Sequence, residues 1–193
     1  MTNTMRRGAA ALLIAATAVT LSSCGDVIRQ SQSPVLLVMD SLLASSGGDS
    51  TFTSPLLSDV VTNQSISNDL GRVVLRIVPK DISIAPSSNN AVTITRYRVT
   101  YRRADGRNTP GIDVPYAFDG GVTVTVPPTG TATLTFDLVR HVAKKESPLV
   151  QLTSGSTVIS TLAEVVFFGQ DLVGNDISVS GLIQINFGDF GDS

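Results

Sequence analysis

After residue 34 the chain is dominated by runs in which apolar and polar residues alternate, the pattern of half-buried β-strands. Val, Ile and Thr recur in these runs, and Gly, Pro, Asn and Asp separate them, whereas a sustained helical period is missing. The expected strands span 34–45, 54–62, 72–79, 92–106, 120–130, 131–142, 159–171 and 175–187. Segment 34–45 is continuously apolar and would also fit a short helix, and 54–62 is the weakest of the set.

The clearest alternation lies in the run RYRVTYRR, which begins at Arg96. Because successive side chains of a strand point to opposite faces, this run predicts one apolar and one polar face. The expected core positions are Tyr97, Val99 and Tyr101. The expected solvent-facing positions are Arg96, Arg98, Thr100 and Arg102.

About seven to nine strands with few helices predict an all-β fold, an antiparallel β-sandwich, as one domain over 34–193. The run ITRYRVTYRRADG resembles the third strand of a fibronectin type III domain. The run VVFFGQDLVGNDISVSG resembles the last hairpin of bacterial immunoglobulin-like modules, with its turn at Asp171–Asn175. This likeness covers about 70–190 and departs from antibody domains, since the chain has one Cys and no Trp.

The first residues have the order of a secretory signal peptide. Arg6 and Arg7 precede an apolar run from Gly8 to Leu21, and small residues follow. The run of about 14 residues is shorter than the roughly 20 that a membrane-spanning helix needs. We therefore expect residues 1–23 to direct export and to be removed.

The single cysteine ends this region in the sequence Leu21-Ser22-Ser23-Cys24. These four residues resemble a bacterial lipobox, which implies a diacylglycerol-modified, palmitate-bearing Cys24 at the mature N-terminus and a tether over 24–33. The alternative is cleavage at a neighbouring small residue, which leaves a free thiol at Cys24. The mature chain also resembles uncharacterised bacterial envelope lipoproteins that end in a similar NFGDFGD tail. Gly25 followed by Asp26 favours the outer membrane over the inner one in a cell that has both.

Loss of Arg6 and Arg7 with the signal peptide takes the 14 basic side chains to 12, against 16 acidic ones. A mildly acidic domain does not present the basic face that nucleic acid requires. Nucleic acid is therefore not an expected partner.

Catalytic chemistry has few candidates in this sequence. His141 is the single histidine, and its position in LVRHVAKK predicts an exposed strand end rather than a general base. The sequence has no nucleophile elbow, phosphate-binding loop or dinucleotide fingerprint. One His and one acylated Cys also cannot make a transition-metal site. We expect a non-enzyme without a cofactor.

Three features are candidates for binding. Arg96, Arg98 and Arg102 share one strand face and predict a basic strip for an anionic partner; the alternative is a solvated face. Asp171, Asn175 and Asp176, with Asp189 and Asp192 in the tail, offer hard oxygen ligands for calcium, although Asp and Asn are also ordinary turn formers. Tyr116 is the one tyrosine outside the strand pattern, and we expect it to plug an end of the sandwich.

The sequence therefore predicts a membrane-anchored, extracytoplasmic lipoprotein of the cell envelope that binds or scaffolds without catalysis. Its expected partners are membrane lipid, through acylated Cys24, and an envelope protein. The alternative is a ligand-binding lipoprotein, calcium-dependent in one version, or an accessory subunit of a membrane complex.

Overall fold

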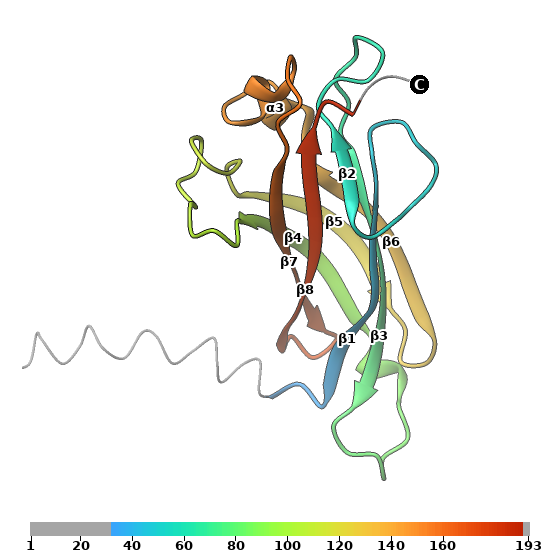
Figure 1. Ribbon diagram of the computed structural model, residues 1–193. Coiled ribbons are helices and arrows are strands. Elements are labelled where there is room, and N and C mark those ends of the chain that lie inside the picture. Colours follow the sequence, from blue (N-terminus) through green and yellow to red (C-terminus); the bar gives the residue numbers. More distant parts are fainter. Residues whose placement is uncertain (1–31, 191–193) are drawn as a thin grey trace, which may run out of the picture.

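The computed structural model of the protein describes residues 32–190. Eight strands in this part of the chain form two sheets that pack face to face (Figure 1). The strands are β1 (Val35–Ser45), β2 (Leu56–Asp59), β3 (Asp69–Pro79), β4 (Val92–Arg102), β5 (Phe118–Val126), β6 (Thr131–Val139), β7 (Ile159–Asp171) and β8 (Asp176–Gly188). Three short helical turns also occur: η2 (Ser88–Asn90), α3 (His141–Lys144) and η3 (Leu149–Leu152). The predicted all-β sandwich is confirmed.

One sheet has the order β1-β3-β6 and the other the order β2-β8-β7-β4-β5. β7 lies between β4 and β8, as strand F lies between C and G in an immunoglobulin-like sandwich. The prediction of a wholly antiparallel fold is wrong at one place, because β2 pairs parallel with β8. The connection 46–55 turns back along β1, with Ala44 and Thr53 exchanging two backbone hydrogen bonds of 2.9 and 2.7 Å. β2 therefore starts part-way along the sandwich and runs in the direction of β8.

Two predicted boundaries need correction. Segment 34–45 forms a strand and not a helix, and its inward Val35 and Leu37 are buried. The strand predicted over 131–142 ends at Val139, and the chain turns into α3 at His141. This turn carries Lys144 into the protein interior, where it meets a buried carboxylate of β3. A tertiary contact thus overrides the local strand pattern.

The predicted alternation of β4 is confirmed, with Tyr97, Val99 and Tyr101 buried and the three arginines outside. The Tyr97 ring meets the Phe136 ring of the opposite sheet edge-to-face, with centroids 5.0 Å apart. Gly120 lies against the Tyr97 ring, where any side chain would collide with it. The Tyr101 hydroxyl donates a 2.6 Å hydrogen bond to the Leu138 carbonyl, which ties β4 to β6 across the core.

The sandwich has two ends that differ in their connections (Figure 1). At the near pole Val35 pairs with Pro79 and Val92 pairs with both Asp171 and Val126, so the chain enters there. The near pole comprises Ser33–Pro34 and the connections 80–91, 127–130 and 172–175. The far pole comprises the connections 46–55, 60–68, 103–117 and 140–158. Among residues 32–190, no helix is long and apolar enough to span a bilayer.

Candidate functional site

The expected anchor, Cys24, and the lipobox residues Leu21, Ser22 and Ser23 lie outside the described residues. The chain that follows them is held firmly where it enters the near pole. Ser33 is buried, and its hydroxyl bonds to the carboxylate of Asp171 in the β7–β8 turn. The Pro34 carbonyl accepts a 2.9 Å hydrogen bond from the Lys80 amide. The start of the domain is thus tied to two neighbouring connections of this pole.

Asp171 organises the turn between β7 and β8. Its Oδ1 accepts hydrogen bonds from the backbone amides of Val173 (3.0 Å) and Asn175 (2.9 Å). Its Oδ2 accepts a 2.9 Å hydrogen bond from the Asn175 side chain. Burial raises the pKa of this carboxyl, but the hydrogen bonds from Asn175, Val173 and Ser33 outweigh it and hold the pKa below its usual value.

The other calcium candidates are placed apart from a common centre. Asn175 presents its amide nitrogen, not its oxygen, to Asp171. Asp176 accepts a 2.8 Å hydrogen bond from Gln170, and Asp189 follows the opposite end of β8. Within 32–190 no three His, Cys, Asp or Glu side chains gather as metal ligands would. Turn formation accounts for Asp171 and Asn175 without an ion.

The basic strip lies on the outer face of the five-stranded sheet, and acids accompany each of its arginines. Arg96 and Arg98 lie 2.8 and 3.8 Å from the two carboxylate oxygens of Asp119 on β5. Arg102 lies 3.3 Å from the Glu164 carboxylate on β7. These pairs are exposed, so each contributes about 0–1 kcal/mol to stability. Their main effect is to reduce the positive potential that the strip would offer an anionic partner.

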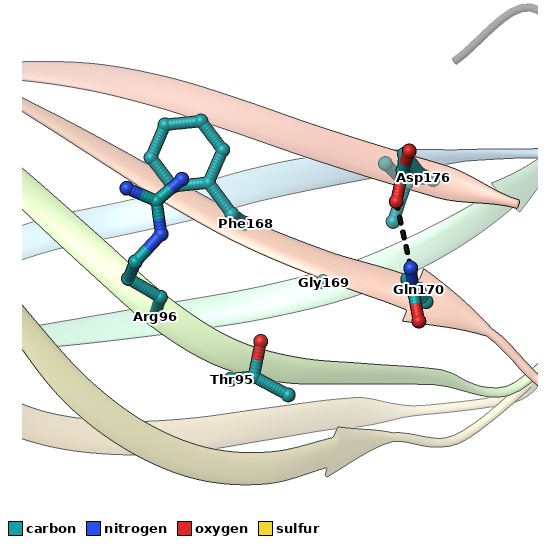
Figure 2. Close-up of a pocket in the computed structure, with 7 residues that line it drawn as sticks. Thr95, Arg96, Phe168, Gly169, Gln170 and Asp176 are labelled. Carbon is teal, nitrogen blue, oxygen red and sulfur yellow. Dashed lines mark hydrogen bonds between the residues drawn. The ribbon is translucent and has the colours of Figure 1, made fainter. Parts of the chain in front are cut away.

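A hollow of about 420 Å³ opens beside the strip, towards the near pole (Figure 2). The Arg96 guanidinium lies over the Phe168 ring at 4.1 Å from its centroid and forms one wall. Asp176 and its partner Gln170 form the other. Gly169 lies between them, and its backbone passes so close to Thr93 of β4 that a side chain would collide. The register shift of β4 between Ile94 and Arg96 occurs at the same level.

A groove of about 300 Å³ lies at the far pole, between the end of connection 103–117 and α3. Tyr116, Phe118 and Val142 give it apolar walls, and Arg140 and Glu146 add charge. Arg140 stacks over Phe118 at 3.9 Å from the ring centroid. Tyr116 is 60% exposed and rests against Gly111. The expectation that Tyr116 plugs the sandwich is wrong, because it lies on this surface.

The far pole also contains a buried ion pair that the sequence pattern did not reveal. The Lys144 ammonium lies 2.6 Å from Oδ1 of Asp69, and both side chains are almost wholly buried. Lys144 also donates to the Asp59 carbonyl at 2.7 Å. Asp69 accepts further hydrogen bonds from the Ser58 hydroxyl and the Gly47 amide. Burial raises the pKa of the Asp69 carboxyl, and the adjacent ammonium opposes that rise.

The neighbouring His141 is exposed, as expected, although it begins α3 and does not end a strand. Its Nδ1 lies 2.9 Å from the Asn68 side-chain oxygen, which also accepts a 2.6 Å hydrogen bond from the His141 amide. A carboxamide oxygen is not a nucleophile that a histidine activates. This arrangement caps the start of α3 and offers no support for base catalysis.

Comparison with known proteins gives little more. The sequence matches no family and no curated protein. One similar solved structure is the X-ray structure of Northeast Structural Genomics Consortium target SoR45, which is 11% identical. The alignment covers 82% of this chain and 88% of that one, with a TM-score of 0.37.

Proposed function

We propose that the protein is a lipid-anchored module of the cell envelope that binds or scaffolds a partner and performs no catalysis. The observation that carries this proposal is the single cysteine, Cys24, in the sequence Leu21-Ser22-Ser23-Cys24. It follows a basic start and an apolar run too short to span a bilayer. A thiol with no second cysteine in the chain to pair with is explained by acylation.

The arrangement of the sandwich supports an anchored role. The tether joins the domain at the near pole, so the lipid would hold that pole close to the membrane. β8 runs from the near to the far pole over 13 residues. At about 3.3 Å per residue it spans roughly 40 Å. The far pole would therefore project away from the leaflet, where a partner can reach it.

The far-pole groove supports the binding part of the proposal. It combines exposed Tyr116 and the ring of Phe118 with Arg140, and aromatic residues and arginine are enriched in protein interfaces. Arg140 is held in place by a 2.6 Å hydrogen bond to the Asp119 carbonyl as well as by Phe118. A pre-organised arginine beside an aromatic surface suits a protein partner of mixed apolar and acidic character.

The alternative is a ligand-binding lipoprotein that uses the hollow beside Arg96. The observation favouring it is that Arg96 and Asp176 face the same 420 Å³ space (Figure 2). A small zwitterionic ligand would find both charges there. Titration with calcium and with amino acids, followed by the chemical shifts of Gly169 and Asp176, separates this function from scaffolding.

Fatty-acid incorporation tests the proposal in a host that carries the lipoprotein pathway. Cells grown with an alkyne-tagged palmitate should label the wild-type protein, whereas Cys24→Ala should remain unlabelled. Ser31→Ala, in the tether but outside the four-residue motif, is the matched control and should label like the wild type. A wild-type protein without label, or equal labelling of Cys24→Ala, would contradict the proposal.

A further inference from the structure

Two near-pole connections carry apolar side chains at their tips. In the connection 80–91, Ile82 is 94% exposed and Ile84 is 64% exposed. In the β7–β8 turn, Leu172 is 61% exposed and Val173 is 74% exposed. Figure 1 shows the connection after β3 reaching furthest from the sheets at this end of the molecule. Such side chains gain nothing from folding, because they remain in water in the isolated domain.

These connections are also nearly free of charge. The segments 80–91, 127–130 and 172–175 together contain Lys80 and Asp81 as their charged residues. Asp81 is engaged within its own turn, where it accepts hydrogen bonds from the amide and hydroxyl of Ser83 at 2.9 and 2.6 Å. The far-pole connections differ, with Arg103, Arg107, Arg140 and Lys145 among their charged residues. Few charges would have to lose water if the near pole met lipid.

The position of Cys24 limits how far the near pole lies from lipid. Eight residues separate Cys24 from Gln32, the first described residue. Even a fully extended chain of that length spans at most about 30 Å. Acyl chains on Cys24 would therefore keep the two connections within reach of the leaflet, at a high effective concentration.

We infer that the near pole docks on the surface of the leaflet, with Ile82, Ile84, Leu172 and Val173 inserted among the lipid headgroups and upper acyl segments. This inference rests on the proposed function, because the anchor on Cys24 determines which pole meets lipid. Burial in lipid gives these four side chains the apolar environment that the folded domain does not supply. The docked pole then sets the orientation of the sandwich and directs the far-pole groove outward.

The local hydrogen bonds make the pole suitable for docking. Asp171 holds the turn that displays Leu172 and Val173, and the same carboxylate bonds to Ser33. The amide of Lys80 bonds to Pro34, two residues before the exposed Ile82. The apolar tips are therefore fixed relative to the point where the tether joins the domain, which lowers the entropy lost on docking.

Depth-dependent quenching tests the inference on the protein extracted from membranes in its processed form. With Cys24 acylated, Ile82→Cys or Val173→Cys introduces the one free thiol for an environment-sensitive fluorophore. Ile112→Cys is the matched control, because Ile112 is also an exposed isoleucine, 68% exposed, but lies in a far-pole connection. The proteins are placed in phosphatidylethanolamine–phosphatidylglycerol vesicles with and without nitroxide-bearing lipids. We expect blue-shifted emission and several-fold stronger quenching at 82 and 173 than at 112.

An intact mass on each preparation distinguishes the two proposals. If the acyl mass is present and the labels at 82 and 173 behave like the label at 112, docking is overturned while anchoring stands. If the acyl mass is absent, the proposed function fails, and the same labelled proteins are mixed with vesicles at high lipid concentration. Because Cys24 would then be a free thiol, a Cys24→Ser background keeps the label unique. Quenching confined to 82 and 173 would still support docking, and equal quenching at all three positions would overturn it.

Discussion

The two poles of the sandwich are closed in different ways, although the same strands end at both. At the near pole, short hydrogen bonds around Ser33 and Asp171 hold connections that point apolar side chains outward. At the far pole, longer and more charged connections converge on the buried pair of Lys144 and Asp69. The near pole leaves apolar surface for something outside the domain, whereas the far pole is completed by interactions within it.

This difference shows where stability and function are separated in the molecule. Lys144 joins α3 to β2 and β3 through its bonds to Asp59 and Asp69, so the far-pole connections depend on one another for their conformation. The apolar tips Ile82 and Val173 have no such role, because they are mostly solvent-exposed. A substitution at the far pole should therefore unfold the domain, whereas one at the near-pole tips should change only what the domain touches.

The largest effect is expected when the buried ion pair is broken. Lys144→Ala leaves the Asp69 carboxylate buried beside Ser58 without its cation, and should lower the free energy of unfolding by about 3–5 kcal/mol. Urea denaturation followed by circular dichroism measures the change. Lys145→Ala, which removes the adjacent exposed lysine, is the control and should stay within about 0.5 kcal/mol of wild type. Equal effects of the two variants would show that the pair does not close the far pole.

A smaller effect is expected when the near-pole turn is released. Asp171→Ala removes the acceptor for the amides of Val173 and Asn175, which should lower the free energy of unfolding by about 1–3 kcal/mol. Hydrogen exchange should show faster exchange at those two amides and unchanged protection in α3. Asp176→Ala, which loses only the contact to Gln170, is the matched control. Protection lost equally at both poles would contradict the separation described above.

The same carboxylate predicts the direction of a pH effect. Its hydrogen bonds hold the pKa of Asp171 in the folded protein below the usual value of 3.8. The stabilisation is therefore complete above pH 3.8 and is lost as the pH falls through the lower pKa of the folded state. The difference in unfolding free energy between wild type and Asp171→Asn should accordingly shrink as the pH falls below that range. A difference that grows with acidity would mean that the pKa is raised.

The sequence predicted the strands well where burial follows a local period. The alternation of Tyr97, Val99 and Tyr101 with arginines is visible in the residues themselves, and the structure places them as expected. The parallel pairing of β2 is not visible there, because it depends on how connection 46–55 turns back along β1. The early end of β6 is also set by a distant partner, since α3 forms where Lys144 reaches Asp69.

The candidate sites show the same division. The Arg96 strip was found from its period, but its acidic partners Asp119 and Glu164 come from other strands, so their pairing needed the structure. The role of Asp171 as a turn former was among the alternatives, because Asp and Asn commonly bond to nearby amides. The apolar tips were missed, since Ile82 and Ile84 read as part of a strand-like pattern between β3 and β4. Only their place beside the start of the chain gives them significance.

The intact mass of the protein purified from membranes, with mapping of its first residue, tests the account most directly. The account predicts a chain that begins at residue 24 and carries the added mass of a diacylglycerol and acyl chains on Cys24. The near pole would then face lipid of necessity. A chain that retains residues 1–23, or one that begins elsewhere with a free Cys24 thiol, would contradict the account and remove the reason why the two poles differ.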